Sequence, residues 1–135
     1  MNSQGAYKKY QNVQVKTANK GKLLIMLYEG CVKFLRLAEK SIEEKEMEAA
    51  NNYLIRSQDI INELMVTLDM EKGGEIAENL YKLYDFMMSQ LIEANINKDV
   101  EKIELVEDFM LELLDSWKQI ISAKHKEEEK LSANA

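Results

Sequence analysis

The alternation of apolar and polar residues predicts four long helices in this chain. Within residues 17–42, one set of apolar side chains recurs at the three- and four-residue spacing of a helix face. A second set lies beside it on the same helix: Leu23, Met26, Gly30, Phe34 and Leu37. A surface helix of a globular protein has a single apolar stripe, so this helix needs covering from several directions. We expect it to be the central helix of the fold, or to be shared with a partner.

Three more helices are predicted downstream, at about residues 47–69, residues 75–95 and from residue 100 onward. Gly73-Gly74 separates the second helix from the third because glycine takes positive φ readily, and Ile76 is expected to point inward. Asn95 reads as a turn residue and Asp99 as the N-cap of the last helix. That helix carries the clearest heptad, with Ile103, Val106, Met110, Leu113, Trp117 and Ile120. Short connections between long helices predict an all-α fold, an antiparallel four-helix bundle of residues 17–126.

The two ends of the chain differ from this bundle. Residues 1–16 show no helical periodicity, and we expect a flexible cap arm, extended or in a short helix. Its apolar anchors are Tyr7, Tyr10, Val13 and Val15. Thr17 and Asn19 are both acceptable N-caps for the first helix. Residues 127–135 form a charged tail that we expect to be disordered.

Composition narrows the class of protein. The chain has 135 residues, which suits one domain, with no proline and a single cysteine. One cysteine excludes an internal disulfide and fits a reducing compartment. The longest apolar run, residues 23–28, is far shorter than the ~20 residues of a membrane span, and no signal peptide is visible. We expect a soluble, cytoplasmic protein without stable membrane insertion.

Charge is distributed unevenly along the chain. Residues 1–22 contain five lysines and no acidic residue, whereas the rest of the chain carries a net charge of −11. A basic arm on an acidic body raises the alternative of nucleic-acid binding. Docking of the arm on its own acidic body is favoured, so we expect no nucleic-acid partner.

Candidate chemistry is sparse. The one histidine, His125, lies in the charged tail, and Cys31 lies on the apolar seam of the first helix, where an inert thiol is expected. There is no Glu-x-x-His pair and no phosphate-binding loop, so we predict no catalytic residue, no cofactor and no metal. The surplus apolar surface points instead to a groove for another chain's helices, or to a homodimer. The candidate groove residues are Leu23, Met26, Phe34, Leu37, Ile55 and Val66.

Several dispersed motifs resemble the FliS family of flagellar export chaperones. They are Tyr7-x-x-Tyr10, residues 15–18, residues 22–30 ending in Leu-Tyr-Glu-Gly, residues 57–64, residues 91–95, and Trp117-Lys118. Their order and number make the resemblance specific over nearly the whole chain. One departure is Asn19-Lys20, where the family commonly has Ser-Pro, so the start of the first helix is less rigid.

The resemblance implies a cytoplasmic, non-enzymatic four-helix bundle that binds the C-terminal region of flagellin. Such a chaperone prevents premature polymerisation and delivers its client to the type III flagellar export gate. The client wraps around the chaperone, and the N-terminal cap moves from a hydrophobic groove when the client binds. The alternative that remains open is a helical adaptor or a homodimeric structural bundle.

Overall fold

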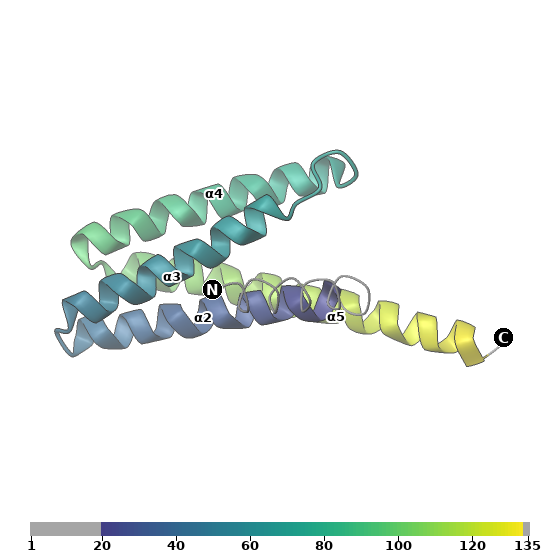
Figure 1. Ribbon diagram of the computed structural model, residues 1–135, viewed down its shortest axis with the longest axis horizontal. Helices are drawn as coiled ribbons and strands as arrows, with labels where there is room; N and C mark the ends of the chain where they lie inside the picture. The colour runs from purple at the N-terminus through teal and green to yellow at the C-terminus, as the bar shows by residue number, and fades with distance from the viewer. Residues whose placement is uncertain (1–19, 134–135) are drawn as a thin grey trace, which may run out of the picture.

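A computed structural model describes residues 20–133 of the chain. Four helices follow one another in it, α2 (Lys20–Glu43), α3 (Met47–Val66), α4 (Gly74–Asn97) and α5 (Val100–Ala133). Short turns join them, and consecutive helices run in opposite directions (Figure 1). The predicted all-α antiparallel four-helix bundle is therefore confirmed. The predicted cap arm with Tyr7, Tyr10, Val13 and Val15, and the N-caps Thr17 and Asn19, lie outside the described residues.

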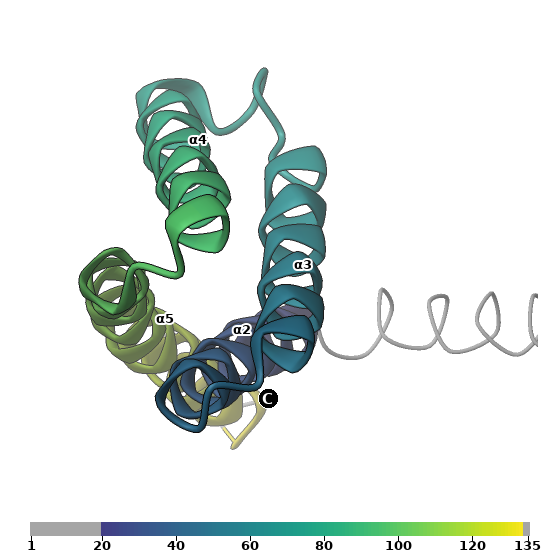
Figure 2. The same cartoon turned by 90° about the vertical axis from the view of Figure 1, so that its left-hand side faces the viewer.

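The four helices form a ring around one core. Each helix packs against the next, and α5 returns to α2, whereas the diagonal pairs α2/α4 and α3/α5 do not approach through their backbones (Figure 2). The central space is filled by buried side chains from all four helices, among them Leu35, Leu54, Ile61, Leu91 and Ile103. The first predicted helix, α2, is thus not encircled by the other three helices: it packs against α3 and α5, and residues 20–133 leave part of its apolar surface uncovered.

One polar contact crosses the core diagonally. The hydroxyls of Tyr28 on α2 and Tyr84 on α4 are hydrogen-bonded, and the two rings meet edge to face with centroids 6.5 Å apart. Burial is the main cause that raises the pKa of both phenols. Because each hydroxyl partners the other, neither carries the cost of an unsatisfied polar group. Trp117, a member of the predicted heptad, is partly buried against this core.

The register of α5 departs from the predicted heptad beyond Met110. Leu114 rather than Leu113 is buried, and Ile120, expected inside, is 56% exposed. Ile121 takes the inward position and packs on Gly21 of α2, where an added methyl group would lie 3.0 Å from its Cδ1. A straight helix has 3.6 residues per turn, so a 3.5-residue pattern drifts by about 20° per heptad. The heptad was therefore wrong at its far end.

The turn from α3 to α4 begins earlier than predicted. α3 ends at Val66 instead of residue 69, because the Asp69 carboxylate accepts hydrogen bonds from the backbone N–H groups of Glu71 and Lys72 and so folds a turn. Gly74 has φ of +53°, as the glycine pair predicted. Ile76, expected to point inward, is 71% exposed, since Ala77 takes the inward position.

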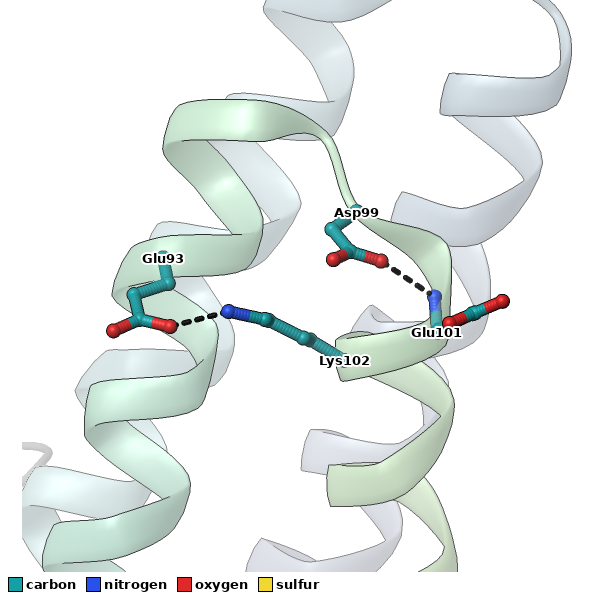
Figure 3. A network of polar contacts seen from close by, with 4 residues as sticks. All are labelled: Glu93, Asp99, Glu101 and Lys102. Atoms are coloured by element: carbon teal, nitrogen blue, oxygen red, sulfur yellow. Dashed lines mark hydrogen bonds and ion pairs between the residues drawn. The ribbon is translucent and has the colours of Figure 1, made fainter.

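The turn from α4 to α5 is fixed by polar contacts. α4 extends two residues beyond its predicted end, to Asn97, and Lys98 then adopts a left-handed conformation. The Asp99 carboxylate accepts the Glu101 backbone N–H at 3.1 Å, which confirms Asp99 as the N-cap (Figure 3). One turn further on, Lys102 forms an ion pair with Glu93 across the two helices (Figure 3).

The C-terminal part of α5 projects beyond the rest of the bundle (Figure 1). Residues 127–133 continue the helix, whereas the sequence suggested a disordered tail from residue 127. Strong helix formers and a contact between His125 Nε2 and Glu129 Oε1, one turn apart at 3.0 Å, favour the helical state. Across residues 20–133, no helix has the length and apolar character needed to cross a bilayer.

Candidate binding surface

The six predicted groove residues all lie outside the buried core. Met26, Ile55 and Val66 are exposed, and Leu23, Phe34 and Leu37 are partly buried. The structure does not bring all six together. Four of them follow one flank of α2, and two lie on α3.

The four residues on α2 form a single line along the helix, which we call the α2 stripe: Leu23, Met26, Phe34 and Leu37. Gly30 continues this line, and a Cβ atom there would lie 3.5 Å from Ile60 of α3. Phe34 stacks on Tyr53 of α3 with ring centroids 6.2 Å apart, and the Arg56 guanidinium lies 5.5 Å from the Phe34 centroid. The α2 stripe is therefore an apolar margin along the contact between α2 and α3.

The two residues on α3 lie on another side of that helix than the α2 stripe. Ile55 and Val66 are eleven residues apart, which is close to three full helical turns, so they lie on one face. Asn51 and Gln58 are four residues before and three residues after Ile55, on that same face. Both line a pocket shared with α4. The predicted groove is thus divided between the two flanks of α3.

This α3/α4 pocket is a shallow surface cavity of about 270 Å³. Its lining combines amide and isoleucine side chains: Asn51, Gln58, Ile92, Asn95 and Ile96. Ile92 and Ile96 are both exposed. The Asn95 amide donates to the Asn51 amide oxygen at 2.7 Å, and Lys98 Nζ donates at 2.6 Å both to the Asn95 amide oxygen and to the Asn95 backbone carbonyl. The five lining side chains are uncharged, and Lys98 lies beside the pocket, bonded to Asn95.

The lining of the pocket has unused hydrogen-bonding capacity beside apolar side chains. Each amide side chain offers two donor and two acceptor positions, and the Asn51–Asn95 bond uses only one on each residue. The remaining positions suit backbone or side-chain amides of a bound segment. The flanking isoleucines can bury that segment's apolar side chains, as in recognition of a helix in a groove.

Groups that could support catalysis or metal binding are not assembled in residues 20–133. No cluster of three metal-ligating side chains occurs in that part of the chain. Cys31 is buried, as predicted, and burial raises the pKa of its thiol to about 12, which disfavours the reactive thiolate. His125 is exposed on the projecting part of α5.

The chain matches the family model described as flagellar protein FliS over residues 2–124. It belongs to the FliS family of flagellar secretion chaperones. The flagellar secretion chaperone FliS of Bacillus subtilis is 40% identical over 124 residues, which cover 92% of each chain. The FliS protein of Salmonella typhimurium is 39% identical over 107 residues, covering 78% of this chain and 79% of that protein.

A solved structure of a bacterial flagellar chaperone has the same fold. Its TM-score to this FliS chain is 0.74, and the alignment covers 90% of this chain and 98% of the other. The two sequences are 21% identical, so this likeness supports the fold alone.

The sequence reasoning named none of the five residues that line the α3/α4 pocket as a binding residue. Asn95 was interpreted as a turn residue, yet it lies inside α4 and is held there by its bond to Asn51. A signal was present, because Gln58, Ile92 and Asn95 all lie in stretches that carry the FliS resemblance. Residues in such stretches that are polar or exposed on a predicted helix are better candidates for binding than for packing.

Proposed function

We propose that this FliS chain binds the C-terminal region of flagellin in the cytoplasm, keeps it from polymerising prematurely and delivers it to the flagellar export gate. The observation that carries the proposal is the exposed apolar surface on both flanks of α3. The α2 stripe lies on one flank and the α3/α4 pocket on the other. A client that wraps around the chaperone would contact both.

The energetics favour a client that covers both surfaces. Full burial of a leucine, isoleucine or phenylalanine side chain contributes about 1.5–3 kcal/mol, and association itself costs at least ~4 kcal/mol. One small surface would leave little net affinity. Two surfaces joined by one continuous client supply the larger interface that stable complexes need, above about 1,200 Å².

The N-terminal segment enters this proposal as a cap that the client displaces. Burying its four apolar anchors gains at most about 1.5–3 kcal/mol each, and ordering about ten residues costs on the order of 1 kcal/mol apiece. These opposing contributions nearly cancel, so a larger client interface wins the competition. The chaperone acts by occupancy and needs no turnover.

The experiment is a titration of the chain with a C-terminal flagellin fragment, followed by light scattering and calorimetry. We expect a one-to-one complex whose affinity changes little between low and physiological salt, because the contacts are mainly apolar. Leu37→Asp should weaken it by at least about tenfold, since a charge would face the buried interface. Ile120→Asp is the matched control, because Ile120 is exposed on α5, which contributes to neither surface.

The alternatives give other results. A homodimeric or adaptor bundle would show a stable dimer without flagellin and no change when the fragment is added. A nucleic-acid-binding protein would show steeply salt-dependent binding to nucleic acid and none to the fragment.

A further inference from the structure

Two carboxyl groups and one guanidinium meet where α2 packs against α5, and the charge of a third carboxyl group acts on them from nearby. Arg36 of α2 donates from Nε to Oε1 of Glu107 on α5 at 2.7 Å, and the Glu107 side chain is only 12% exposed. Glu39, one turn beyond Arg36, approaches the same Glu107, and the charge of Glu104 on α5 also acts on Glu39. The single positive charge therefore faces more negative charge than it can neutralise.

Oε1 of Glu39 is enclosed, and no donor among the described residues reaches it. An ionised carboxylate only accepts hydrogen bonds, so an ionised Glu39 would leave this oxygen buried and unsatisfied. A protonated Glu39 would donate a hydrogen bond to Glu107. This supplies the hydrogen bond that the ionised form lacks, and it removes the repulsion between the two carboxylates. One proton thus both satisfies the buried carboxyl group of Glu39 and relieves its repulsion with Glu107.

We propose that Glu39 and Glu107 share one proton at neutral pH, and that this proton makes the contact between α2 and α5 sensitive to pH. The charged groups that act on Glu39 are Glu107 and Glu104 from α5 and Arg36 from its own helix. Among the described residues, α3, which packs on the other flank of α2, adds none to this set. Separation of α2 from α5 would return Glu39 to water and release the proton.

The electrostatics agree with this geometry. The pKa of Glu39 is raised to about 8, and burial is the largest cause. The hydrogen bond to Glu107 and the negative charge of Glu107 raise it further. The folded chain therefore holds a proton that the unfolded chain, with an ordinary carboxyl, does not. The stabilisation from this proton is complete below the ordinary carboxyl pKa, and it is lost as the pH rises through about 8.

The test compares the full chain with Glu39→Gln, whose amide can still donate to Glu107. We expect the original chain to release about one more proton on unfolding at pH 7 than the variant does, measured by calorimetry in buffers of different ionisation enthalpy. Its urea midpoint should fall between pH 6 and 9, whereas that of the variant should stay level. Glu29→Gln, an exposed change on the same helix, should behave like the original chain.

Equal proton release and equal pH slopes for the original chain and Glu39→Gln would overturn the proposal. Should Glu39→Gln fail to fold, the original chain still decides the matter by carbon NMR of its labelled glutamate carboxyl groups. One resonance that titrates near pH 8 supports the shared proton. Titration of every glutamate in the ordinary carboxyl range contradicts it.

Discussion

The α2/α5 contact and the α3/α4 contact are built alike but use different polar chemistry. Both join antiparallel neighbours in the ring, and both place polar side chains beside the apolar core. At α2/α5 these side chains are charged, with Glu39 and Glu107 around Arg36. At α3/α4 they are neutral amides, with Asn51 and Asn95 paired between exposed isoleucines.

This difference suggests that the α2/α5 contact stabilises the bundle, whereas the α3/α4 contact can also bind a partner. The charged groups at α2/α5 are occupied with one another, so we expect this contact to depend on pH and salt. The amides at α3/α4 keep unused donor and acceptor positions, and Ile92 and Ile96 remain uncovered. Client binding should therefore depend on α3/α4, and the pH response of the fold on α2/α5.

The largest effect is expected at the α3/α4 pocket. Ile92→Asp should weaken flagellin-fragment binding by about 2 kcal/mol or more, roughly 30-fold, because it puts a charge into the centre of a desolvated interface. Its urea midpoint should barely change, since Ile92 is exposed in the free chain. Calorimetric titration measures the affinity, with Ile120→Asp as control. Unchanged affinity for Ile92→Asp would remove the pocket from the binding surface.

Substitutions at the α2/α5 contact should have a smaller effect, and they should change the free energy of unfolding without changing client binding. Arg36→Met leaves the largely buried Glu107 without its partner, so unfolding free energy should fall by about 1–2 kcal/mol. Adding Glu107→Gln in the same chain should recover part of this loss, because the unpaired charge is gone. Urea denaturation at pH 7 provides both values. A double variant less stable than Arg36→Met would contradict this explanation.

The amide pair should contribute about 1 kcal/mol. Asn95→Ala removes the hydrogen bond to Asn51 and the amide contact of Lys98, so the urea midpoint should fall modestly. Because amide side chains do not titrate, the loss from the Asn51–Asn95 bond should be the same at pH 6 and at pH 8. A loss that changes strongly with pH would show that the two contacts are not electrostatically distinct.

Raising the salt concentration should have the smallest effect on stability, but it should distinguish the two helix contacts most clearly. Screening weakens partly exposed ion pairs, and exposed pairs contribute only about 0.2–1 kcal/mol. The stability difference between the original chain and Arg36→Met should therefore shrink by a few tenths of a kcal/mol when salt is raised to about 1 M. The difference for Asn51→Ala should not change. Equal salt responses of the two variants would argue against the contrast.

Periodicity was sufficient to predict the fold but not the register at the helix ends. The spacing of apolar residues identified each helix, because a helix must bury one face whatever its neighbours are. The positions of Ile76 and Ile120 were wrong, since the ends of the bundle depend on turn geometry and on drift from the heptad. Sequence spacing contains neither of these.

The candidate site was predicted only in part for a related reason. A helical wheel identifies apolar residues outside the seam, such as Leu37 and Ile55, but not which neighbouring helix they face. The pocket also depends on Asn95, whose type favours turns, while its contact with Asn51 is 44 residues away in sequence. Contacts of that kind become visible only when α3 and α4 lie side by side.

The central claim is that this chain suppresses flagellin polymerisation by occupying flagellin, one chain to one. The direct measurement is seeded filament growth followed by turbidity, with the chain added at increasing ratios to flagellin and no nucleotide present. We predict that suppression saturates near one equivalent. Ile92→Asp should weaken this suppression, and Ile120→Asp should leave it unchanged. No suppression at excess would contradict the chaperone function, and complete suppression far below one equivalent would contradict occupancy as the mechanism.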